Sequence, residues 1–86
     1  MPLDKLQQQK LFFACRRGML ELDLLLQPIY SYAIDNFNLM QFNNFMELLQ
    51  EPDPVIHAWI LGTELPETNK FDNLLLNIQK LNNIVF

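Results

Sequence analysis

The fold class is decided by the stretch FNLMQFNNFMELL at residues 37–49. Asn38 stands before the first apolar residue of the run, and Gln41 follows three positions later. This is the spacing of a capping box, and Phe37 with Phe42 has the spacing of the hydrophobic staple that often accompanies it. Apolar residues then recur with a helical period, at Leu39, Phe42, Phe45, Met46 and Leu49. The stretch therefore predicts a helix that begins after Asn38.

Apolar residues on both sides of this stretch follow the same period. One stripe precedes it, at Leu22, Leu25, Leu26, Ile29 and Ala33. Another follows it, at Phe71, Leu74, Leu75, Ile78 and Leu81. Two shorter helices are predicted over Leu6 to Cys15 and Val55 to Leu61. Because 86 residues close one modest core, the sequence predicts an all-α protein, a compact five-helix bundle joined by brief turns, with a single domain over residues 1–86.

Four helix boundaries are marked less completely. Gly18 either ends the first helix or caps the second. Pro28 falls inside a stripe and predicts a kink or a break there, because it removes one backbone hydrogen bond. Asp53 before Pro54 is typical of a cap followed by proline at the first helical position. Thr68 is the expected cap of the last helix.

Composition excludes several classes of function. The net charge is −4, from six basic and ten acidic residues. Nucleic-acid binding requires clustered cationic charge, so we do not expect it here. Cys15 is the sole cysteine, which favours a reducing compartment. No apolar run approaches the roughly 18 residues of a membrane span, and the N-terminal residues lack the apolar core of a secretory signal. We therefore expect a protein of a bacterial-type cytoplasm, without membrane insertion.

Enzymatic and metal sites find little support. His57 is the only histidine and Cys15 the only thiol, so neither a zinc ligand set nor a Cys/His pair is indicated. No glycine-rich phosphate loop is present. We expect no enzyme, no metal and no tightly bound cofactor. One catalytic alternative stays open, a small acid-base site built from Glu21 and Asp23.

The densest group of charged residues is Arg16-Arg17-Gly18-Met19-Leu20-Glu21-Leu22-Asp23, between the first two predicted helices. Basic residues at a helix end and acidic residues at a helix start complement the helix dipoles, and Arg17 could pair with Glu21. Exposed ion pairs contribute only about 0 to 1 kcal/mol, which is a weak reason for so many charges. The corner is therefore either an ordinary turn between helices or a binding surface.

The same stretch resembles the RGxxE signature of the succinate dehydrogenase flavinylation factors, the bacterial FAD assembly factor family and its mitochondrial relatives. The resemblance runs from about Phe13 to Gln79. Its further positions are Pro28, Ile29, Tyr30, Phe45, Leu48, Leu49, Asp53, Pro54, Trp59, Pro66, Ile78 and Gln79. Two departures are visible: Ile29 replaces a common aromatic residue, and the tail Asn82-Asn83-Ile84-Val85-Phe86 is more apolar than usual.

The resemblance implies a five-helix assembly factor that binds the flavoprotein subunit of succinate dehydrogenase, and of fumarate reductase as a further client. It would act as a monomer and promote covalent attachment of FAD to a histidine of the client, with the FAD handled on the client. The other function that stays open is a generic helical adaptor for protein-protein interaction, using the same corner or the apolar tail.

The expected partner-binding residues are Arg16, Arg17, Gly18, Glu21 and Asp23. Both arginines would supply forked donors to the client. Gly18 would let the client backbone approach, and Glu21 would accept hydrogen bonds or orient Arg17. Asp23 is a neighbouring candidate. Signature substitutions, among them Arg17→Ala, would then leave a folded protein that no longer supports flavin attachment.

Aromatic residues near the corner have a second possible role. Phe12, Phe13, Tyr30 and Tyr32 could extend the docking surface, although core packing is expected for at least two of them. Trp59 is expected in the core, so that Trp59→Ala would lower the melting temperature.

Overall fold

The computed structural model describes residues 2–84, which form five helices and no strand. These are α1 (Lys5–Cys15), α2 (Leu20–Asn36), α3 (Leu39–Leu48), α4 (Asp53–Leu61) and α5 (Asp72–Leu81). The radius of gyration is 12.0 Å, equal to the value of about 12 Å expected for a compact chain of this length. The prediction of an all-α five-helix bundle is therefore confirmed.

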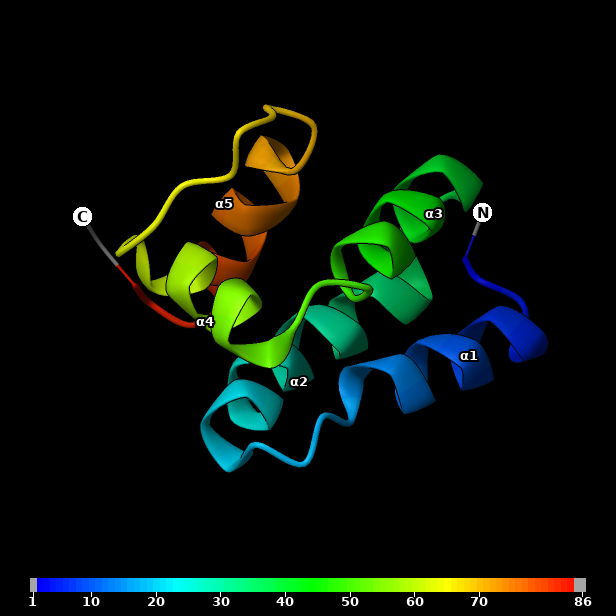
Figure 1. Cartoon of the computed structure of the whole chain (residues 1–86). Coiled ribbons are helices and arrows are strands. Elements are labelled where there is room, and N and C mark those ends of the chain that lie inside the picture. Colours follow the sequence, from blue (N-terminus) through cyan, green and yellow to red (C-terminus); the bar gives the residue numbers. More distant parts are fainter. Residues whose placement is uncertain (1, 85–86) are drawn as a thin grey trace.

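Helix α2 is the longest helix, and α1, α4 and α5 pack directly on it (Figure 1). It contacts α1, α4 and α5, while α3 packs on α1 and α5 packs on α4 as well. The buried side chains form a single cluster to which all five helices contribute, and no polar side chain of the described residues is buried. Each helix is therefore held by the apolar stripe it turns toward α2 and its neighbours.

Two helices begin with a complete capping box. At α3 the side chain of Asn38 accepts from the N–H of Gln41 at 2.8 Å, and the Gln41 side chain accepts from the N–H of Asn38 at 2.9 Å. The predicted start of this helix is confirmed. Asp4 and Gln7 form the same arrangement at α1, with distances of 2.7 and 2.9 Å. This second box was not predicted, and the helix begins one residue before the predicted start at Leu6.

The predicted caps of the last two helices are wrong. Pro52 occupies the N-cap position of α4, so Asp53 is the first helical residue and its carboxylate makes no cap. Helix α5 begins at Asp72 after Phe71, and Thr68 lies in the preceding connection, where its hydroxyl accepts from the N–H of Lys70 at 3.3 Å. Residues 62–71 thus form a longer connection than the brief turn expected there.

Pro28 does not break its helix, since α2 runs without interruption from Leu20 to Asn36. The missing N–H leaves the carbonyl of Leu24 without its usual partner in the helix. Packing compensates, because Leu22, Leu26 and Ile29 around this position are completely buried. The predicted break is excluded.

Most of each predicted stripe is buried, with exceptions at the helix ends. Leu39 at the start of α3 and Leu81 at the end of α5 are exposed, against expectation. Trp59 is only half-buried: its ring packs against the core at Phe71, with centroids 5.9 Å apart, so the core assignment is correct for one side of it. In the tail, Ile84 packs against the core, and the amide of Asn82 donates to the carbonyl of Leu25 at 2.9 Å.

The apolar tail identified in the sequence also includes its last two positions. Val85 and Phe86 lie outside the described residues.

Replacing Phe45 by alanine should lower the free energy of unfolding by about 3 to 5 kcal/mol, because it leaves a cavity in the core. The Phe45 ring is completely buried and lies 6.0 Å from the ring of Phe37. Urea denaturation followed by circular dichroism measures the change. The control is Phe13→Ala, since Phe13 is 72% exposed and should change stability by no more than about 0.5 kcal/mol. Equal losses in the two variants would contradict the assigned core.

Candidate functional site

The corner between α1 and α2 contains the signature residues. Arg16 occupies the C-cap position of α1 and Met19 the N-cap position of α2, with Arg17 and Gly18 between them. Gly18 therefore neither ends the first helix nor caps the second. Its φ is 79°, a conformation that side chains with a Cβ rarely adopt, and it is exposed. A Cβ placed there would meet nothing within 4 Å, so the backbone angle, not crowding, calls for glycine.

The guanidinium group of Arg17 turns inward and bonds to four groups of its own chain. Its Nε donates to Oδ1 of Asp53 at 2.6 Å. Its Nη1 donates to the carbonyls of Leu49 at 2.7 Å and Ala14 at 3.0 Å, and its Nη2 donates to the carbonyl of Glu51 at 2.9 Å. Only 16% of the side chain is exposed. Arg17 therefore ties the end of α1 to the α3–α4 turn and to α4.

This geometry revises the role expected of Arg17. Four of its five N–H donors are used within the chain, which leaves no free fork for a partner. The ion pair suggested with Glu21 does not form, since Arg17 pairs with Asp53. Arg17 thus holds the corner in place, whereas the neighbouring Arg16 is exposed.

Asp23 holds the corner from the other side. It lies in the first turn of α2 and is half-buried. Its Oδ1 accepts from the backbone N–H of Arg17 at 2.7 Å. The hydrogen bond fixes the short segment between the helices, so Asp23 also shapes the corner.

Glu21 faces solvent beside α4. Its side chain is 76% exposed, and Oε2 lies 3.3 Å from Nε2 of the half-buried His57. The contact is an ion pair only when His57 is protonated. Sequence reasoning did not anticipate this contact, because Glu21 lies on α2 and His57 on α4.

Arg16 lies over an exposed aromatic surface. Its guanidinium carbon is 5.3 Å from the ring centroid of Phe12, within the range of a cation–π contact. Phe12 in turn meets Phe13 and Tyr30 edge to face, with centroids 5.5 and 5.8 Å apart. Phe12, Phe13 and Tyr32 are exposed and only Tyr30 packs against the core. The expectation that at least two of these four rings are core residues is therefore wrong.

Leu20 and Leu24 are exposed apolar residues that sequence reasoning missed. They are four positions apart and so lie on one face of α2. The signal was their absence from the predicted stripe that includes Leu22 and Leu26, whose side chains are buried. We use the name corner patch for the exposed residues Phe12, Arg16, Gly18, Leu20, Glu21 and Leu24.

A hollow of about 250 Å³ lies between α1 and α2 beside this patch. Phe12, Arg16, Leu24 and Tyr30 line it, together with Cys15. Burial raises the pKa of the Cys15 thiol from 9.0 to about 12, against the opposing influence of the Arg17 guanidinium. The thiol is therefore protonated near neutral pH and is a poor nucleophile.

The described part of the chain has no group of three or more His, Cys, Asp or Glu side chains placed to hold a metal ion. Within residues 2–84, no helix combines the length and apolar character needed to cross a bilayer. The exposed groups of the corner are a guanidinium group, a carboxylate, a glycine and apolar side chains, which are kinds of group found at protein interfaces.

Comparison with known proteins gives consistent matches. Residues 9–82 match the family described as flavinator of succinate dehydrogenase. The FAD assembly factor SdhE of Coxiella burnetii is 37% identical over 78 residues, which is 91% of this chain and 95% of that protein. The protein of the same name from Legionella pneumophila strain Paris is 45% identical over 65 residues, 76% of this chain and 82% of that protein. No solved structure matches the chain.

Replacing Arg17 by lysine should lower the free energy of unfolding by about 2 kcal/mol, since one ammonium group cannot reach the four acceptors that the guanidinium spans. Urea denaturation provides the measurement. Arg16→Lys is the matched control, because Arg16 is exposed and the change should stay within about 0.5 kcal/mol. A fully stable Arg17→Lys protein would argue against the inward network.

Alkylation of Cys15 by iodoacetamide should be slow in the folded protein and fast in urea. A raised pKa means that the folded state keeps its thiol proton while the unfolded thiol, with a pKa of 9.0, ionises. Between about pH 7 and about pH 9.5 the rate should climb steeply for the unfolded chain and stay low for the folded one. Mass spectrometry of labelled protein against time measures both rates. Rapid labelling under folding conditions would contradict the buried position.

Proposed function

This chain belongs to the family of flavinators of succinate dehydrogenase, and on that basis we propose that it binds the flavoprotein subunit of succinate dehydrogenase and promotes covalent attachment of FAD. The flavoprotein subunit of fumarate reductase is a further client under the same proposal. The observation that carries it is the family match across residues 9–82 together with a signature corner whose Arg16, Gly18 and Glu21 are exposed.

The proposed role is that of an assembly factor and not of a catalyst. The one thiol is buried and protonated, and the one histidine lies against Glu21. The acid-base alternative with Glu21 and Asp23 loses support because Asp23 already accepts the N–H of Arg17. The flavin would be held by the client, and this chain would favour the client conformation in which attachment occurs.

The residues of the corner would divide this work. Arg16 supplies a guanidinium fork that is exposed and oriented over Phe12. Gly18 leaves space for a client backbone, and Glu21 offers an exposed acceptor. Arg17 and Asp23 keep the three in position. The apolar members of the corner patch would supply the surface that loses contact with water on docking.

Glu21→Ala should reduce covalent flavin on the client while leaving the factor folded. Glu21 is exposed, so its loss should change stability by no more than about 0.5 kcal/mol. Losing a charge-assisted hydrogen bond to the client should weaken docking about tenfold. The measurement is in-gel flavin fluorescence of the dehydrogenase subunit, in cells that lack the native factor and express the variant.

Asp35→Ala serves as the control, since Asp35 is also an exposed acidic residue of α2 and lies outside the corner. It should support flavin attachment fully. If Glu21→Ala and Asp35→Ala behave alike, the corner is not the docking site. If the flavoprotein subunit fails to co-purify with the unaltered chain, the proposal of direct binding is wrong.

A further inference from the structure

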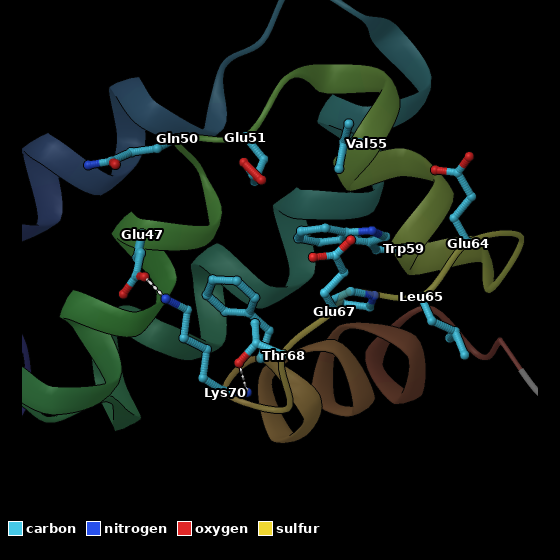
Figure 2. A pocket seen from close by; sticks show the side chains of 12 residues that line it. Glu47, Gln50, Glu51, Val55, Trp59, Glu64, Leu65, Glu67, Thr68 and Lys70 are labelled. Carbon is cyan, nitrogen blue, oxygen red and sulfur yellow. Dashed lines mark hydrogen bonds and ion pairs between the residues drawn. The ribbon is translucent and has the colours of Figure 1, made fainter.

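A second hollow, of about 540 Å³, lies between α4 and the connection 62–71. Its aromatic side is formed by Trp59, which is half-buried, and by Phe71, which Trp59 contacts at a tilt of 32°. Figure 2 shows the lining residues, with Trp59 near the centre of the view. The carboxylates of the lining come from α3, from the α3–α4 turn and from the connection: Glu47, Glu51, Glu64 and Glu67. No residue of the corner patch lines this hollow.

The hollow already holds one cation of its own chain. The ammonium group of Lys70 pairs with Glu47 and lies 5.3 Å from the ring centroid of Phe71. At this position of the hollow, one ammonium group thus contacts both a carboxylate and an aromatic ring. The three other carboxylates of the lining, those of Glu51, Glu64 and Glu67, make no ion pair with any residue of 2–84. The rest of the lining, which includes Trp59, therefore has the same two kinds of group without a cation.

We propose that this hollow binds an arginine side chain carried by a segment of a partner protein. A guanidinium group is planar, so it stacks on an indole face and donates to carboxylates in its own plane at the same time. The apolar side chains of Val55 and Leu65, which also line the hollow, suit the aliphatic stem of an arginine. The volume exceeds that of one side chain, so neighbouring residues of the segment fit beside it.

The negative charge of the lining argues against other classes of ligand. An acidic segment or a phosphate would meet the carboxylates that line the hollow, and like charges repel. A flexible polyamine carries the right charge but has no plane to stack on Trp59. The net charge of −4 on the whole chain adds long-range attraction for a basic segment.

This inference goes beyond the proposed function and does not depend on it. The arginine hollow, as we name this site, uses none of Arg16, Gly18 and Glu21. Its test needs no flavoprotein and no flavin, so flavin attachment and arginine binding can succeed or fail separately.

Fluorescence provides the test, because Trp59 is the only tryptophan of the chain. The full chain is titrated with the blocked peptide Gly-Arg-Gly-Arg-Gly, with the same peptide containing lysine in place of arginine, and with spermidine. The arginine peptide should change the Trp59 emission to saturation, and the lysine peptide and spermidine should bind more weakly. Added salt should weaken all three, since the groups are near the surface.

Glu67→Gln and Asp35→Asn each remove one negative charge, but only Glu67 lines the hollow. Glu67→Gln should weaken binding of the arginine peptide by up to about fivefold, as expected for loss of one exposed ion pair. Asp35→Asn should leave it unchanged. Circular dichroism verifies that both variants are folded.

Three outcomes would overturn the proposal. The first is an arginine titration without a saturable change in emission. The second is an equal loss of affinity in Glu67→Gln and Asp35→Asn, which would mean attraction by net charge alone. The third is binding of spermidine as tight as that of the arginine peptide, which would mean a cation site without recognition of arginine.

Discussion

The guanidinium group of Arg17 joins parts of the chain that no helix connects. It bonds to the carbonyls of Ala14, Leu49 and Glu51 and to the carboxylate of Asp53. Carbonyls at the end of a helix have no partner within it, and here one side chain satisfies acceptors at the ends of α1 and α3. The same bonds hold the corner that displays Arg16 and Gly18, and they fix the backbone of Glu51 behind the arginine hollow. The two proposed binding surfaces therefore share one internal support.

The corner between α1 and α2 thus combines two kinds of residue at adjacent positions. Arg17 and Asp23 face the chain and determine the shape of the corner, whereas Arg16, Gly18 and Glu21 face solvent. A sequence motif does not separate these roles, because it gives residue types and spacing but not the direction in which each side chain points. Arg17, with only 16% of its side chain exposed, is one of the two arginines that sequence reasoning had assigned to a partner.

Local interactions are what the sequence predicted well. The helical periods, the capping box at Asn38 and the number of helices all depend on residues within four positions of each other. The bond from Arg17 to Asp53 joins residues 36 positions apart, so no spacing rule announces it. Asp53 was expected to cap a helix because Pro54 follows it directly in the sequence. Its observed partner, Arg17, is too distant in the sequence to have been anticipated.

Exposure on α2 was predictable only in part. Residues 20–26 contain leucine at five positions, Leu20, Leu22, Leu24, Leu25 and Leu26. The predicted stripe included Leu22 and omitted Leu20 and Leu24, but a helix that is apolar on nearly every side does not show whether another element covers its remaining face. Only the packing of α1, α4 and α5 decides it, and that packing leaves Leu20 and Leu24 uncovered.

The place of α5 has a consequence for synthesis on the ribosome. This helix comes last among the five, yet it closes the core against α2 and α4, with Leu74, Leu75 and Ile78 buried there. Until α5 has emerged from the ribosome, the apolar surface that it covers in the folded protein is exposed to water. Such surfaces favour aggregation, so the core of this protein is protected only once its last helix has been made.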